Sequence, residues 1–193
     1  MAKTTSVLIV GVGGQGTLLA SRILGEFAAE IGLECKLSEV HGMSQRGGSV
    51  VTHVRFGNEV NSPIVAEGEA DYILAFEQLE AFRYRHFLKD EGTIIMNTQK
   101  IMPMPVILGN TPYPANIGER LRGEGLNLIE VDALKIAEDV GNSRTINTVI
   151  LGCFMKMLGV EQALAEKIIT AVVPQRFLEI NLSAFKRGYD YLG

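Results

Sequence analysis

The sequence predicts a single α/β domain, residues 1–193, with a Rossmann-like, mostly parallel sheet, an inserted hairpin and a C-terminal helical layer. Three observations predict this class: short apolar runs bounded by turn residues, a glycine-rich turn between the first run and a helix, and helical periodicity in the last third. Hydrophobic residues make up 47% of the chain and charged residues 21%, which is the balance of a packed globular protein.

The first forty residues predict the opening unit of a doubly wound sheet. SVLIVG at 6–11 is a short apolar run typical of a strand buried on both faces, and GVGGQG follows at 11–16. Apolar residues then recur at steps of three and four over 19–31, which predicts a helix ending at Gly32. A second strand, ECKLSEV, is predicted at 34–40. Strand, glycine-rich turn, helix and strand in this order are typical of nucleotide-binding α/β folds.

The middle of the chain predicts the inserted hairpin and three further strands. Alternation in SVVTHVRF at 49–56, followed by a Gly57-Asn58 turn, predicts a hairpin near 49–62. Several prolines are expected to keep 98–114 out of helix. The other strands predicted here are 71–76, 92–97 and 127–131, and the helices are 78–89, 115–122 and 133–140.

The last third predicts three helices. An apolar stripe over 146–157 marks the first, which ends at Gly159. The other two are predicted over 161–172 and 175–190. The side chains expected to face inward on the last helix are Phe177, Ile180, Ala184 and Phe185. Cys153 lies on the apolar stripe of the first helix, so we expect a buried structural thiol there.

Composition argues against several functional classes. The net charge of −4 gives no basic face for nucleic acid, and no apolar run approaches the ~20 residues of a membrane helix. The apolar run near the N-terminus ends in glycines, as a buried strand does, so we expect a cytoplasmic protein without a signal peptide. Cys35 and Cys153 lie far apart without a close Cys or His partner, so no metal site and no self-contained iron–sulfur cluster is expected.

The glycine-rich turn is a candidate phosphate-binding loop. Gly11, Gly13 and Gly16 satisfy G-x-G-x-x-G: the first permits a tight turn, the second a close phosphate, and the third close packing of the helix on the sheet. The helix N-terminus then offers unpaired N–H groups to an anion. The alternative is a tight turn without a ligand. Glu39 could bind a ribose, but it leads into the loop 41–48 rather than a crossover helix, which argues against a dinucleotide.

The segment HGMSQRGGSVV at 41–51 is a second candidate ligand loop. Arg46 offers a planar fork suited to phosphate or carboxylate, and the glycines after it allow backbone N–H groups to face an anion. The alternatives are a solvated turn whose arginine pairs with a carboxylate, or a loop that only faces another subunit. The candidate ligand-binding residues of both loops are Gly11, Gly13, Gly14, Gln15, Gly16, Ser44, Gln45, Arg46, Gly47 and Gly48. No catalytic residue is identified.

Three segments carry a resemblance to a known family: GVGGQG at 11–16, EVHGMSQRGGSVVTHVRFG at 39–57 and NLSAFKRG at 181–188. Together they resemble the gamma-type domain of 2-oxoacid:ferredoxin oxidoreductases, and the resemblance spans nearly the whole chain. As a free-standing chain of this length, the sequence is most similar to the small (beta) subunits of the indolepyruvate enzymes.

The resemblance implies a division of labour. The family decarboxylates a 2-oxoacid on thiamine diphosphate, passes two electrons through iron–sulfur clusters to ferredoxin, and captures the acyl group on coenzyme A. This chain has no Cys-rich motif and no G-D-G…N-N segment, so the resemblance places thiamine diphosphate, magnesium, clusters and ferredoxin contact on a large partner subunit. This chain would help bind coenzyme A and complete that site for indolepyruvate or another arylpyruvate. The alternatives are a stand-alone NAD- or flavin-binding oxidoreductase and a non-enzymatic assembly subunit.

Two spatial expectations follow. We expect 11–16 and 41–48 to lie side by side at the carboxyl ends of adjacent strands, where open α/β sheets bind ligands, and to form one anion-accepting mouth. We also expect QKIMPMPVILG at 99–109 to contribute to a contact with the partner, because its methionines and aliphatic residues lie among prolines. The alternative for that segment is a well-packed internal connection.

Overall fold

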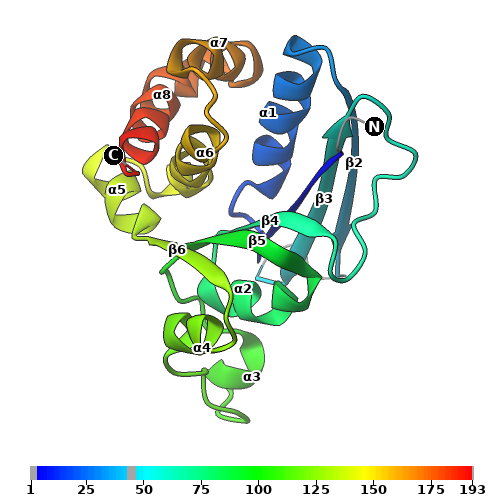
Figure 1. Cartoon of the computed structure of the whole chain (residues 1–193). Coiled ribbons are helices and arrows are strands. Elements are labelled where there is room, and N and C mark those ends of the chain that lie inside the picture. The colour runs from blue at the N-terminus through cyan, green and yellow to red at the C-terminus, as the bar shows by residue number, and fades with distance from the viewer. Residues whose placement is uncertain (1–3, 43–46, 193) are drawn as a thin grey trace.

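The computed structural model describes residues 4–42 and 47–192, which contain a six-stranded sheet in the order β2-β3-β1-β4-β5-β6 (Figure 1). The strands are β1 (Thr5–Val12), β2 (Glu34–His41), β3 (Ser49–Gly57), β4 (Ala70–Ala75), β5 (Leu88–Asn97) and β6 (Asn127–Val131). β1, β4, β5 and β6 pair in parallel, whereas β3 runs antiparallel to both β1 and β2. Only β3 is reversed, so the predicted α/β class with a mostly parallel sheet is confirmed.

Helices cover both faces of the sheet. α1 (Thr17–Glu30) and the C-terminal helices lie on one face, and α2 (Gln78–Tyr84) and α4 (Ile117–Gly123) lie on the other (Figure 1). Apolar side chains of β1 point alternately to the two faces, so a helical layer on each face is needed to bury them. Val7 and Ile9 belong to the core under α1, and Leu8 and Val10 belong to the core on the opposite face. The other helices are η1 (Arg85–Phe87), α3 (Met104–Ile107), α5 (Ala133–Asp139), η2 (Ser143–Thr145), α6 (Ile146–Met157), α7 (Gln162–Val172) and α8 (Gln175–Asp190).

The inserted hairpin exists, but its predicted partners were wrong. β3 pairs with β2, from Glu34 opposite Gly57 to His41 opposite Val50, and not with the segment after Gly57. Its other edge is taken by β1. Since a strand has only two edges for backbone hydrogen bonding, none remained for residues 58–62.

Two predicted segments, 78–97 and 98–114, also differ from the structure, each for a local reason. The predicted helix 78–89 ends at Tyr84, because Leu88 is buried and already pairs with Ala70 as the first residue of β5. A single helical turn, α3, interrupts the proline-rich segment that was expected to be non-helical. Pro103 and Pro105 are compatible with it because the first turn of a helix does not use its N–H groups.

The C-terminal helical layer is held by a close contact between α6 and α8. A Cβ on Gly188 would lie 2.0 Å from the carbonyl oxygen of Val149, and one on Gly152 would lie 2.3 Å from that of Phe185. Asn181 accepts a hydrogen bond from Thr148 at 2.7 Å. The NLSAFKRG segment therefore supplies the α8 side of this contact.

Two side chains predicted for this layer have different outcomes. Cys153 is fully buried and donates to the carbonyl of Gly188 at 3.1 Å, and burial raises its pKa to about 12, so it is a structural thiol as expected. Phe177 was expected to face inward, but it is 42% exposed. It lies in the first turn of α8, where the guanidinium of Arg176 covers its ring at 4.6 Å.

Candidate functional site

The glycine loop and the start of β3 meet at the carboxyl end of β1. The N–H of Gly13 donates to the carbonyl of Gly48 at 2.8 Å, so the described parts of segments 11–16 and 41–48 lie side by side. The expectation that the two segments follow adjacent strands is wrong, because β3 lies between β1 and β2. The loops still meet because the reversed β3 begins where β1 ends, with Ser49 opposite Val12.

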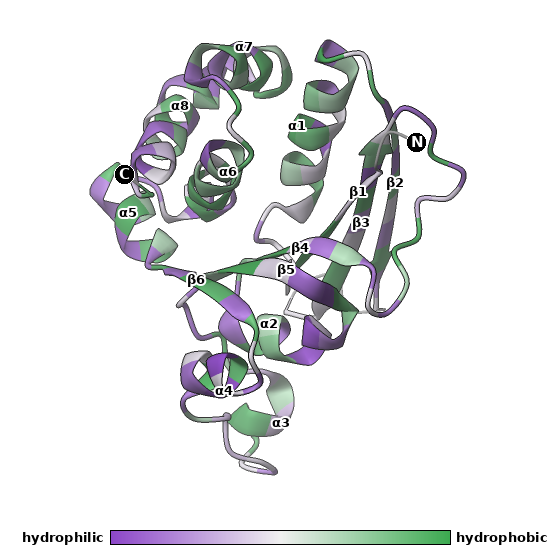
Figure 2. Ribbon diagram, in the orientation of Figure 1, coloured by the Kyte–Doolittle hydropathy of each residue, from purple (hydrophilic) through white to green (hydrophobic). Residues whose placement is uncertain are grey.

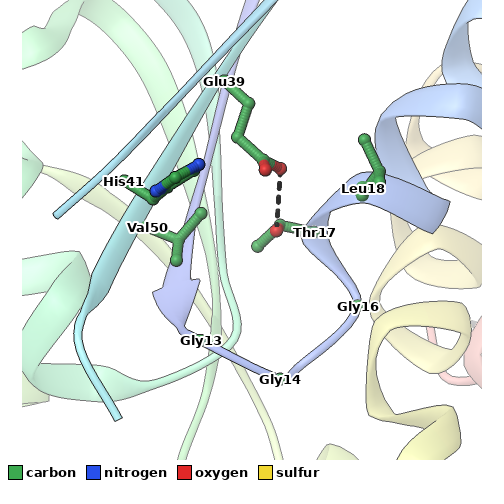
Figure 3. A pocket seen from close by; sticks show the side chains of 8 residues that line it. All are labelled: Gly13, Gly14, Gly16, Thr17, Leu18, Glu39, His41 and Val50. Carbon is green, nitrogen blue, oxygen red and sulfur yellow. Dashed lines mark hydrogen bonds between the residues drawn. The ribbon is translucent and has the colours of Figure 1, made fainter. Parts of the chain in front are cut away.

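A pocket of about 420 Å³ opens beside this contact (Figure 3). It is lined by Gly13, Gly14, Gly16, Thr17, Leu18, Glu39, His41 and Val50. Three of the predicted ligand-binding glycines therefore line it. The exposed Gly47 and the partly buried Gly48 follow in the second loop. The predicted Ser44, Gln45 and Arg46 lie outside the described residues.

The glycines are required for reasons that differ in part from the predicted ones. Gly14 and Gly16 have φ values of 102° and 83°, a left-handed backbone that side chains disfavour. A Cβ on Gly16 would lie 2.5 Å from Nδ2 of Asn147, which donates to the Gly16 carbonyl at 3.1 Å. The third glycine thus permits the approach of α6 rather than packing of α1 on the sheet. Gly11 lies within β1 and leaves room for the amide of Gln15, 3.0 Å from its would-be Cβ.

Gln15 was predicted to bind a ligand, and both ends of its side-chain amide already have hydrogen-bond partners within the chain. Its Oε1 accepts from the N–H of Val12 at 2.8 Å, and its Nε2 donates to the carbonyl of Phe76 at 2.9 Å. A longer contact of 3.3 Å joins Nε2 to Oε1 of Gln99. Gln15 therefore ties the glycine loop to the ends of β4 and β5 and shapes the site from behind.

The pocket combines a helix N-terminus with a carboxylate. α1 starts at Thr17 without a side-chain cap, so its first N–H groups are open to an anion. The Glu39 side chain points toward this terminus, where its Oε2 accepts from the hydroxyls of Thr17 and Thr52, both at 3.3 Å (Figure 3). The Glu39 side of the pocket suits hydroxyl or amide donors, while the Gly14 side suits anions. Thr17 and Leu18 were not anticipated, because a helix signature does not show which side chains of its first turn face a cavity.

A buried acidic pair supports the site from the other face of the sheet. Glu77 and Glu80 of the α2 region are only 1% and 2% exposed. Oε2 of Glu80 accepts from the hydroxyl of Ser49 at 2.5 Å, and Oε1 pairs with Arg83 at 2.7 Å. Burial raises the pKa of the Glu80 carboxyl, and nearby Glu77 adds to the rise, while the Ser49 hydrogen bond and the Arg83 charge oppose it. Glu80 thereby fixes the residue that directly follows Gly48.

We expect Glu80 to make stability depend on pH. Because its pKa is raised in the folded protein, its contribution is complete below its ordinary value of 4.5 and is lost as pH rises through the raised value. Glu80→Gln keeps an acceptor for Ser49 and should flatten this fall in a melting-temperature series from acidic to neutral pH. Glu119→Gln, in an exposed side chain of α4, is the matched control. An unchanged fall in the Glu80 variant would assign it to another group.

Two further findings concern the described residues as a whole. None of the helices in residues 4–42 and 47–192 combines the length and apolar character that a membrane span needs. Within the same residues, no three His, Cys, Asp or Glu side chains gather as a metal ion would require.

Known proteins resemble the chain over nearly its full length. The family model described as pyruvate ferredoxin/flavodoxin oxidoreductase matches residues 6–191. Indolepyruvate oxidoreductase subunit IorB of Pyrococcus horikoshii is 39% identical over 96% of this chain and 95% of its own. IorB of Archaeoglobus fulgidus is 40% identical over 96% and 94%. The gamma subunit of a keto/oxoacid ferredoxin oxidoreductase from Geobacter sulfurreducens has a TM-score of 0.71 at 26% identity, with 96% of each chain covered.

These matches confirm the resemblance carried by the three sequence segments. The chain belongs to the pyruvate ferredoxin/flavodoxin oxidoreductase family and is a subunit of a 2-oxoacid:ferredoxin oxidoreductase.

Proposed function

We propose that this chain is the small subunit that binds coenzyme A at the glycine loop and completes the thiamine diphosphate site of a large, cluster-bearing subunit. The 2-oxoacid would be indolepyruvate or another arylpyruvate, in keeping with the relatives named above. The observation that carries the proposal is the joining of the two candidate loops, through Gly13 and Gly48, beside one pocket at the carboxyl end of β1.

The pocket has two chemically different sides, and coenzyme A has groups for both. Its phosphates suit the backbone N–H of Gly14, the start of α1, and the guanidinium of Arg46. Its ribose hydroxyl or pantetheine amides suit the carboxylate of Glu39, which already accepts from two hydroxyls. A purely anionic ligand would be repelled by Glu39, so the mixed character of the pocket favours a nucleotide thiol over free phosphate.

The decarboxylation and electron-transfer groups do not fit this chain. An iron–sulfur cluster is commonly held by four cysteine thiolates, and the chain has two cysteines. Cys153 is enclosed in the C-terminal layer, and burial raises the pKa of Cys35 to about 11. Bound to the partner, thiamine diphosphate supplies carbanion chemistry. In this proposal the glycine loop and its neighbours position coenzyme A at the edge of that site.

The alternative of a stand-alone nucleotide oxidoreductase has one observation in its favour, the carboxylate of Glu39 at the ribose-binding end of β2. Titration of the purified chain with NADH, FAD and coenzyme A separates the possibilities. Of these three compounds, only coenzyme A should bind. Saturable binding of NADH or FAD would favour the alternative, and binding of none of the three would favour an assembly subunit.

We expect Arg46→Ala to raise the coenzyme A requirement of the reconstituted enzyme by about ten- to 150-fold, because a charged, bidentate hydrogen bond contributes roughly 1.5–3 kcal/mol. Steady-state turnover against coenzyme A concentration measures it. Arg46→Lys should restore only part of the affinity, since a point charge does not reproduce the planar fork. Arg187→Ala, in an exposed side chain of α8, is the matched control. A lower melting temperature with intact turnover would instead make Arg46 a structural residue.

A further inference from the structure

The segment that follows β5 forms an uncharged tip, residues 101–114. From Ile101 to Gly118 the sequence has no Asp, Glu, Lys or Arg, although charged residues make up 21% of the chain. α3 lies within the tip and projects from the sheet beside α4 (Figures 1 and 2). Depletion of charge is the compositional mark of the centre of a protein–protein interface.

The apolar side chains of the tip are not packed inside the protein. Met102, Met104, Ile107 and Leu108 are 45%, 61%, 62% and 65% exposed. The alternative of a well-packed internal connection is therefore wrong for these four residues. In Figure 2 the ribbon of α3 is coloured as hydrophobic at the foot of the molecule.

The tip is held in shape by one buried carboxylate at its base. Oε1 of Glu77 accepts from the N–H of Ile101 at 3.1 Å and from the hydroxyl of Tyr113 at 2.5 Å, which closes the segment at both ends. Within it, the N–H of Asn110 donates to the carbonyl of Pro105 at 2.9 Å. A surface shaped before binding loses less conformational entropy when it binds.

The base of the tip is continuous with the glycine loop. Ile101 and Gln99 line a second pocket, of about 340 Å³, together with Gly14 and Gln15 on the side of the loop away from Glu39. A protein that covers the carboxyl edge of the sheet to complete the ligand site therefore also reaches the tip.

A second copy of this chain is a poor occupant for the tip. The three largest pockets described on its surface, of about 420, 340 and 490 Å³, contain the charged side chains of Glu39, Arg144 and Arg176 respectively. The tip has no charged side chain of its own, so inserting it into any of these pockets would desolvate their charges against an apolar surface.

We propose that the tip is a preformed docking element that seats in an uncharged, apolar groove of the large subunit. The inference rests on the proposed function for the identity of that partner. Ile107 and its neighbours would supply the buried apolar contacts, and Glu77 would maintain the shape that presents them.

The test compares two exposed isoleucines in the intact complex. Ile107→Lys should weaken association of the purified small and large subunits by about tenfold or more, as loss of a buried apolar anchor does. Ile64→Lys, at a side chain 48% exposed outside the tip, should leave association unchanged. Both isolated variants should melt like the parent chain, because neither side chain is part of a core. Equal association of the two variants would overturn the proposal.

Two further measurements keep the outcome clear. Subunit association is measured without 2-oxoacid or coenzyme A, so a failure of the coenzyme A proposal would not be mistaken for a failure of docking. Hydrogen exchange of residues 101–114 should slow on adding the large subunit, and equal protection in both states would remove the tip from the interface. A dimer of the isolated chain that Ile107→Lys dissociates would assign the tip to self-association and overturn the proposal.

Discussion

The isolated chain, supplied with an arylpyruvate, coenzyme A, thiamine diphosphate and a viologen dye, is expected to show no dye reduction at all. Addition of the large cluster-bearing subunit should restore turnover. The reason is chemical: the chain has two cysteines, both with pKa values raised by burial, and no cysteine-rich cluster motif through which electrons could pass. Absorbance of the reduced dye under anaerobic conditions measures the effect.

The large subunit alone is the control for this experiment. Under the proposed function it should turn over slowly or not at all, since its site lacks the surface that this chain supplies. Dye reduction by the small chain alone would contradict the division of labour. Full activity of the large subunit alone would reduce this chain to an accessory role.

Gly188→Ala is expected to destabilise the fold by roughly 3 kcal/mol or more. The new Cβ would lie 2.0 Å from a backbone carbonyl of α6, so relief requires the two helices to separate. Urea unfolding of the isolated chain measures the loss.

Gly25→Ala is the matched control. Gly25 lies within α1, and a Cβ there would meet only the Leu37 side chain, at an ordinary 3.5 Å. Since alanine favours helix by about 0.5–1 kcal/mol over glycine, this variant should be neutral or slightly more stable. Similar free energies of unfolding for the two variants would show that the α6–α8 contact adjusts without cost.

The parts of the fold predicted from sequence were those governed by local pattern. Apolar runs located β1, β4 and β6 to within a residue or two, and helical periodicity located α6 to α8. The hairpin was misassigned because the sequence shows that 49–56 is a strand but not which neighbours pair with it. Pairing depends on which edges are already occupied, and that is a property of the assembled sheet.

The site was predictable where its chemistry is local. The glycines predicted the loop. The inward orientation of the Gln15 side chain was not predictable, because it depends on a hydrogen bond to the carbonyl of Phe76, sixty-one residues away in sequence. A glutamate in a short helix is usually exposed. Glu80 is instead buried, because its carboxylate accepts a hydrogen bond from Ser49 at the start of β3. Contacts between distant segments decide such roles, and a single sequence does not display them.

The reversed direction of β3 has a consequence for how this family can diversify. Parallel strands need a crossover of a dozen residues or more, usually a packed helix, whereas antiparallel strands can be joined by a short turn. β2 and β3 are antiparallel, so a change in the length of the segment between His41 and Ser49 requires no repacking of a crossover helix, and doubling that length costs only about 0.6 kcal/mol in closure entropy. Such length changes would leave intact the contacts that tie the glycine loop to α6 and to the end of β4.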